Sequence, residues 1–139
     1  MIALLLAVAA QAAAIPATPG LGAIGQQKLP AKGCAAYLWS TADRQLVAMA
    51  TADPATLRVS LGGRTIDLAR TTSSGAARLG FPDSIDYGGD GVTARLTMDV
   101  VQQEGLTAGA RVPTGALQVG RLGQDGIVVP VAGLIGCRA

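Results

Sequence analysis

The chain has 139 residues, of which 50% are hydrophobic but only 3% aromatic, so it is long enough for one modest domain with a core of Leu, Val, Ile and Ala. Its net charge of +2, without any run of basic residues, and its scarcity of aromatic rings disfavour nucleic-acid binding. Histidine is absent, which excludes Ser-His-Asp and Cys-His catalytic sites and any zinc site that uses histidine.

The amino terminus has the pattern of an export signal. Residues 2–10 form an apolar run, and a small-x-small pattern occurs twice between Ala10 and Ala14. The run is shorter than the roughly 20 residues that span a bilayer. We therefore predict a signal peptide over residues 1–14, cleaved between Ala12 and Ala14, and a periplasmic or secreted protein without a transmembrane segment after signal removal. A buried amino-terminal strand or helix is the alternative.

The two cysteines bracket the predicted domain. Residues 15–33 contain three prolines and several glycines and are predicted to form an extended linker. Cys34 follows this linker, and Cys137 lies two residues from the end of the chain. An even number of cysteines in an exported chain predicts a disulfide, which would enclose nearly the whole domain of residues 34–139. Two free buried thiols are the alternative.

The clearest local element is a hairpin over residues 57–68. Apolar and polar residues alternate on both sides of Gly62-Gly63, and two glycines suit the positive φ angles of a two-residue turn. Folding the register about the glycines predicts four cross-strand pairs: Leu57 with Leu68 and Val59 with Ile66 on the buried face, Arg58 with Asp67 and Ser60 with Thr65 on the solvated face.

The rest of the domain also reads as short strands. Candidate strands precede the hairpin at residues 34–39 and 46–51, and residues 92–101 alternate strictly. Residues 71–79, 81–91 and 102–113 lack a clear period and are predicted to be largely loop, with room for a short strand. Residues 117–122 and 127–131 form a last hairpin, in which Pro130 suits an edge position, and residues 134–137 close the chain. Seven to eight strands without a convincing helix predict an all-β fold, a small antiparallel barrel or sandwich.

No residue pattern indicates a catalytic site, a cofactor or a metal site. Asp83, Asp86 and Asp90 lie in a glycine-rich stretch and could supply oxygen ligands to calcium, but Asp and Gly are also the ordinary residues of turns. We therefore expect a protein that is not an enzyme and needs no cofactor. A small hydrolase or metal-dependent enzyme that uses this acidic stretch is the alternative.

The predicted binding residues lie in two polar segments. Ser73, Ser74, Gly75 and Arg78 form a polar loop next to the predicted sheet, where binding contacts are common, although a solvated connection would have the same composition. Tyr87 and Asp90 belong to the second segment, residues 86–91. The lone Trp39 is more typical of packing than of binding.

The chain also resembles a known family. Gly62 to Leu68, then Ser73-Ser74-Gly75-Ala76, and later Tyr87-Gly88-Gly89-Asp90-Gly91-Val92-Thr93-Ala94-Arg95-Leu96 follow the order seen in the periplasmic and membrane-bound inhibitors of C-type lysozyme. The resemblance implies an exported domain with an eight-stranded antiparallel barrel. In the family a loop serine, matched here by Ser74, and a later lysine enter the lysozyme cleft. The lysine position falls at Gly88 or Gly89, and Arg78 is a candidate replacement for the missing cation.

These observations lead to one expectation about function. We expect an exported envelope domain that binds a protein or glycan partner through residues 72–78 and 86–91, with lysozyme inhibition as its sharpest form. A structural component of an envelope assembly is a further alternative.

Overall fold

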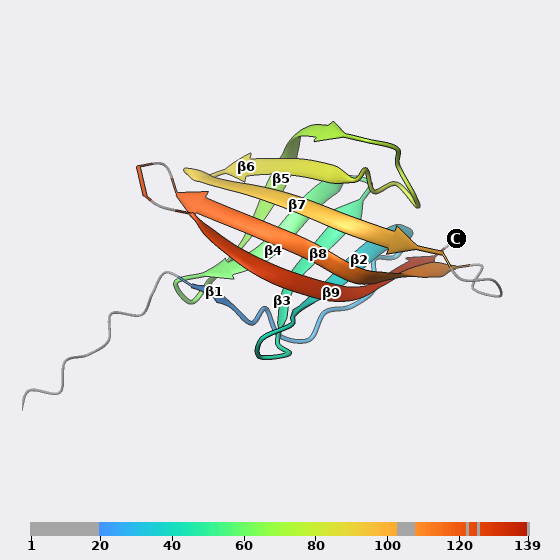
Figure 1. Cartoon of the computed structure of the whole chain (residues 1–139), viewed down its shortest axis with the longest axis horizontal. Helices are drawn as coiled ribbons and strands as arrows, with labels where there is room; N and C mark the ends of the chain where they lie inside the picture. The colour runs from blue at the N-terminus through green and yellow to red at the C-terminus, as the bar shows by residue number, and fades with distance from the viewer. Residues whose placement is uncertain (1–19, 103–107, 122, 125, 139) are drawn as a thin grey trace, which may run out of the picture.

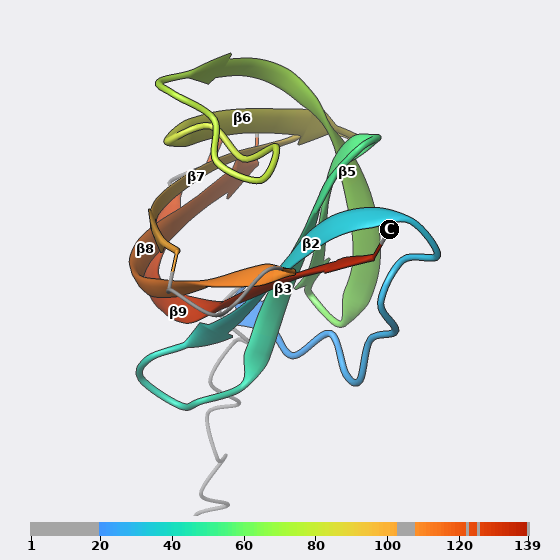
Figure 2. The same cartoon turned by 90° about the vertical axis from the view of Figure 1, so that its right-hand side faces the viewer.

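The structure, a computed structural model, describes residues 20–102, 108–121, 123–124 and 126–138. These residues form nine strands: β1 (Leu21–Gly22), β2 (Gly33–Ser40), β3 (Leu46–Ala52), β4 (Ala55–Leu61), β5 (Arg64–Ser74), β6 (Ser84–Gly89), β7 (Val92–Val101), β8 (Gly109–Arg121) and β9 (Ile127–Arg138). Each strand from β2 to β8 pairs with the next strand along the chain, and β9 pairs with β2. The result is a closed eight-stranded antiparallel barrel with β1 as an extra strand (Figures 1 and 2). The all-β prediction is confirmed, and the fold is a barrel and not a sandwich.

The predicted hairpin forms with the expected register. Strands β4 and β5 pair Leu57 with Leu68, Val59 with Ile66, Arg58 with Asp67 and Ser60 with Thr65. Gly62 and Gly63 have φ angles of +58° and +79°, as the two-residue turn requires. On the outer face Arg58 Nε donates to Asp67 Oδ1 at 2.8 Å.

The alternation of apolar residues places one core inside the barrel. On β7 the apolar set Val92, Ala94, Leu96, Met98 and Val100 is buried while the residues between them are exposed. Strands β2 and β3 contribute small alanines. Tyr87 and Phe81, the two largest fully buried side chains among the described residues, belong to the same interior cluster. The aromatic rings therefore supply volume that the alanine-rich strands do not.

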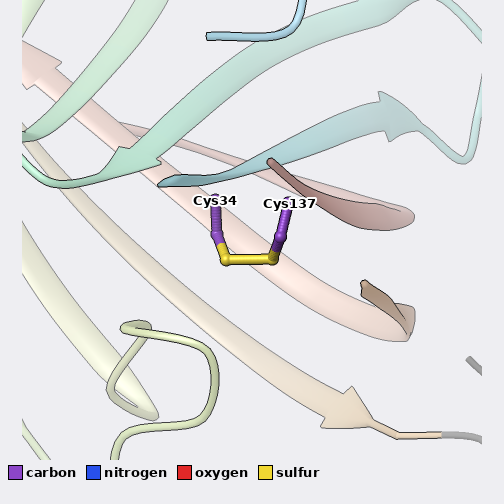
Figure 3. Close-up of a disulfide and its surroundings, with 2 residues drawn as sticks. All are labelled: Cys34 and Cys137. Atoms are coloured by element: carbon purple, nitrogen blue, oxygen red, sulfur yellow. A yellow bond between two sulfur atoms is a disulfide. The ribbon is translucent and has the colours of Figure 1, made fainter. Parts of the chain in front are cut away.

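The disulfide joins the first and last strands of the barrel. Cys34 lies directly opposite Cys137 in the β2–β9 pair, and the two sulfurs are bonded on the inner side of the seam (Figure 3). The predicted disulfide is thus present. We call this end of the barrel the disulfide end; because strands alternate in direction, the β5–β6 loop lies at the same end and the Gly62-Gly63 turn at the opposite end.

Several segments predicted to be loop are strands. Strand β5 continues to Ser74, β6 occupies Ser84–Gly89, and β8 begins at Gly109. No side chain of β5 after Leu68 is buried, so this part has no apolar period to detect. Its backbone is nevertheless paired with β6, which is how the barrel closes on that side.

Pro130 does not lie on an edge strand as predicted. Strand β9 runs without interruption from Ile127 to Arg138 between β8 and β2. The Pro130 carbonyl accepts a hydrogen bond from the Thr41 amide at 3.1 Å, just beyond the end of β2 at Ser40. The Pro130 nitrogen, which carries no hydrogen, faces the same side as its carbonyl. No ladder hydrogen bond is required there because β2 has ended.

Part of the predicted linker packs along the outside of the barrel. Ala35, Tyr37 and Met49 form a small buried cluster on the outer face of β2 and β3, and Ile24 packs against it. The Ile24 amide donates to the Leu46 carbonyl at 2.9 Å, and Tyr37 Oη donates to the Lys28 carbonyl at 3.3 Å. Figure 2 shows this segment, in blue, outside the ring of strands. The predicted signal peptide lies outside the described residues.

Candidate functional site

The β5–β6 loop, residues 75–83, gathers four of the predicted binding residues at the disulfide end. Ser73 and Ser74 end β5, Gly75 begins the loop, and Arg78 lies within it. All four residues are exposed. In Figure 2 the loop, in yellow-green, projects over this end of the barrel. The structure therefore places the four residues on one surface.

This loop is tied to the barrel at several points. Phe81 is only 1% exposed and packs into the interior core. The backbones of Arg78 and Phe81 exchange hydrogen bonds of 3.0 and 2.9 Å, and Arg78 Nη1 donates to the Val100 carbonyl at 3.4 Å. The Met98 amide donates to the Asp83 carbonyl at 3.2 Å. These contacts hold the polar residues of the loop in a defined position relative to the barrel.

Gly75 is required where the chain leaves β5. Its φ angle is +89°, a region that other residues rarely adopt. An added Cβ would lie 2.5 to 2.8 Å from three atoms of the Asp83 side chain, which is closer than non-bonded atoms approach. Gly75 therefore has a structural reason to be present, independent of any partner.

A polar network covers the outer face of β5, β6 and β7. Arg95 donates from Nε to Asp86 Oδ1 at 2.7 Å and from Nη2 to Asp86 Oδ2 at 3.3 Å. Thr72 donates to the same Oδ2 at 2.8 Å. The hydrogen bonds from Arg95, and then from Thr72, lower the pKa of Asp86 below its ordinary value. The carboxylate is thus held ionised in a fixed orientation.

An open groove of about 540 Å³ lies beside this network. Its lining residues come from β5 to β8 and from the segment between β8 and β9: Thr71, Asp86, Tyr87, Thr93, Ala94, Arg95, Gln118, Gly120, Arg121, Gln124 and Gly126. A second, shallower hollow of about 290 Å³ lies further along the same strands, towards the disulfide end. Thr97, Asp99, Thr114 and Ala116 are among its lining residues. The outer face of β7 and β8 is therefore hollowed along much of its length.

Tyr87 and Asp90 do not join the loop residues. The Tyr87 side chain is 2% exposed and belongs to the interior core, so the structure does not offer its ring to a partner. Burial raises the pKa of its phenol. Asp90 lies in the β6–β7 turn, at the opposite end of the six-residue strand β6 from Ser84. At 3.3 Å per residue this strand separates Asp90 from the loop by roughly 20 Å.

The acidic residues considered for a metal are also apart. Asp83 precedes β6, Asp86 lies within it paired to Arg95, and Asp90 follows it. Within the described residues, no group of three or more Asp, Glu or Cys side chains could hold a metal ion. The arrangement therefore does not gather the carboxylates that the hydrolase alternative needs.

Two functional candidates were missed at the level of sequence. Arg95 and Gln118 lie side by side on the outer faces of β7 and β8 and both line the groove. The alternation of residues 92–101 places Arg95 on the solvated face. Its pairing with Asp86 could not be predicted because it depends on β6, and this strand has only two buried apolar residues, Ile85 and Tyr87, to mark it in the sequence.

Comparisons with protein-family models, with curated proteins and with solved structures found no match. In the part of the chain that the structure describes, no helix has the length and hydropathy needed to cross a membrane.

Proposed function

We propose that this chain is an exported, non-enzymatic domain of the cell envelope that binds a protein or glycan partner through Ser73, Ser74 and the β5–β6 loop. The observation that carries the proposal is the combination of exposure and anchoring in this loop. Ser73 and Ser74, which lead into the loop, are exposed, while within the loop Phe81 is buried in the core and Arg78 bonds to β7. A loop fixed in this way loses little conformational entropy on binding, which favours recognition.

The scaffold supports the same function. The closed barrel and its disulfide hold both ends of the loop on neighbouring strands, β5 and β6, whose separation cannot change without breaking the ladder. Rigid sheets that present polar loops are a common architecture for binding proteins. The separated carboxylates give no comparable support to an enzyme.

Inhibition of C-type lysozyme is the sharper form of the proposal. The resemblance to the lysozyme inhibitors implies an eight-stranded antiparallel barrel, and this chain has that fold. Ser74, which matches the family's loop serine, is exposed. The family's lysine position falls near Gly88 or Gly89, neither of which supplies a charge, so Arg78 would have to provide the cation. A turbidity assay with cell walls and lysozyme tests this form; no inhibition at micromolar protein would dismiss it.

The broader proposal is tested by capture from an envelope extract. Wild-type protein is compared with Ser74→Ala, with Arg78→Ala and with the control Thr65→Ala, which changes an exposed residue at the opposite end of β5. We expect a specific partner that Thr65→Ala retains and that the loop variants lose. Because Arg78 also bonds to Val100, its variant is first checked for unchanged thermal stability. A partner captured equally by all four proteins would show that the loop is not the binding surface.

A further inference from the structure

Two glycines, Gly120 and Gly126, are among the residues that line the groove on the outer face of β6, β7 and β8. A Cβ added to Gly120 would lie 3.6 Å from the Gly126 Cα and 3.8 Å from Thr93 Oγ1, which are ordinary contacts. The volume of about 540 Å³ is within the range of small-molecule sites, about 300–1,000 Å³. A Cβ at Gly120 therefore fits without disturbing the strand, and a larger side chain there would project into the groove.

The lining groups suit a neutral ligand rich in hydroxyl groups. Thr71, Thr93, Gln118 and Gln124 all line the groove, and hydroxyl and amide groups both donate and accept hydrogen bonds. Arg95 and Asp86 both line the groove, and because they form an ion pair their charges neutralise one another. Arg121 also lines the groove, and its Nη2 lies 4.0 Å from where a Cβ of Gly62 would be, near the Gly62-Gly63 turn.

Other classes of ligand fit this groove less well. A peptide that adds a strand needs an unpaired sheet edge, and β6, β7 and β8 are each paired on both sides. A peptide that docks through side chains needs apolar anchor pockets, whereas the side-chain groups here are mostly hydroxyl, amide or charged. A nucleic acid needs net positive charge and stacking rings, which the Asp86–Arg95 pair and the buried Tyr87 do not provide.

We propose that this groove binds a neutral oligosaccharide segment. The sugar hydroxyls replace water on Thr93, Gln118 and Gln124, and Arg95 offers them the part of its guanidinium that Asp86 does not use. The second hollow, along Thr97 and Ala116, extends the surface in the strand direction, so the ligand is a segment of a longer chain. This site is separate from the β5–β6 loop and goes beyond the proposed function.

The experiment is an NMR titration of the whole exported protein with maltotriose, cellotriose and tri-N-acetylchitotriose. We expect at least one of these neutral trisaccharides to shift the backbone amides of Asp86, Arg95 and Gln118 with a Kd of about 1 mM or tighter. Gly120→Val places a branched side chain in the groove and should weaken binding at least about 10-fold. Gln118→Ala removes one hydrogen-bonding group and should weaken it by about 2- to 10-fold. Thr65→Val, which adds the same side chain at an exposed position outside the groove, should bind like the wild type.

Three results would overturn the proposal. The first is no amide shift with any of the trisaccharides up to about 20 mM. The second is binding that Gly120→Val leaves unchanged. The third is tighter binding of trigalacturonate or of a blocked neutral hexapeptide, which would assign the groove to an anionic glycan or to a peptide. Because no variant changes Ser74 or Arg78, each of these results leaves the function proposed for the loop standing.

Discussion

Gly133→Ala is expected to open the seam at which the barrel closes. Gly133 lies in β9 opposite Leu38 of β2. An added Cβ would overlap the carbonyl oxygen of Tyr37 and would lie 2.9 Å from the Tyr37 carbonyl carbon and 3.2 Å from the Leu38 Cα. All three atoms are backbone, so no side-chain rotation relieves the contact. The two strands must separate or shift in register.

The magnitude follows from these contacts. Overpacking a filled interior costs about 1–3 kcal/mol. Separating β2 from β9 at this point removes about two ladder hydrogen bonds, each contributing about 0.5–1.5 kcal/mol. The free energy of unfolding should therefore fall by about 2–6 kcal/mol, a large part of the 5–15 kcal/mol typical of a domain. The expected decrease in Tm is about 10 °C or more.

Urea and thermal unfolding, followed by circular dichroism, measure this loss. Gly120→Ala is the matched control, because it introduces the same methyl group in the neighbouring strand β8 with no contact closer than 3.6 Å. Its stability should stay within about 1 kcal/mol of the wild type. A Gly133→Ala protein as stable as this control would show that β2 and β9 are not packed backbone to backbone as described.

Four further predictions concern the tyrosines, the outer network and the disulfide. Tyr87→Phe should raise the free energy of unfolding by about 1 kcal/mol in urea unfolding, because Tyr87 Oη has no hydrogen-bond partner among the described residues and a buried unpaired hydroxyl is costly; a clear loss of stability would contradict this. Burial raises the pKa of both tyrosines, Tyr37 and Tyr87. The contribution of their neutral phenols to the free energy of unfolding is therefore complete below pH 10.0 and is lost as the pH rises through the folded-state pKa values. An ultraviolet titration in which both phenols ionise at pH 10.0 would refute this prediction. Asp86 has a lowered pKa, so its ionised carboxylate contributes to the free energy of unfolding above the ordinary pKa of Asp, and this contribution is lost as the pH falls through the lowered pKa. Arg95→Gln should move the pKa of Asp86, measured by NMR titration, upward. An unchanged titration curve would exclude the Arg95 contact as the cause of the lowered pKa. Replacing Cys34 and Cys137 with serine opens a loop with a sequence separation of 103 and should lower the free energy of unfolding by up to about 4.7 kcal/mol; no decrease would mean that the strands alone close the barrel.

Local alternation predicted the parts of the fold in which the apolar face of a strand is wholly or largely buried. Residues 57–68 and 92–101 have this property, and their register and inward faces follow from it. Strand β6 contributes only Ile85 and Tyr87 to the core, among polar residues and glycines. Its partner residues on β5 contribute no buried side chain, so pairing between backbones, which leaves no trace in hydropathy, determines that part of the barrel.

The candidate site was predicted in part for the same reason. Ser73, Ser74, Gly75 and Arg78 are close in sequence, so their common surface could be predicted from the chain alone. The sequence could not show that residues 84–89 are extended, and this strand carries Asp90 away from the loop and turns Tyr87 inward. Arg95 and Gln118 meet through the pairing of β7 with β8, a contact between residues distant in the chain.

The position of β1 determines how this protein should be attached to a surface for binding measurements. Leu21 pairs with Leu61, next to the Gly62-Gly63 turn, so the first described residues lie at the end of the barrel opposite to Ser74. Arg138, in contrast, pairs with Gly33 at the end that carries the β5–β6 loop. Immobilisation through an amino-terminal tag leaves that loop facing the solution, whereas a carboxyl-terminal tag brings the sensor surface against it.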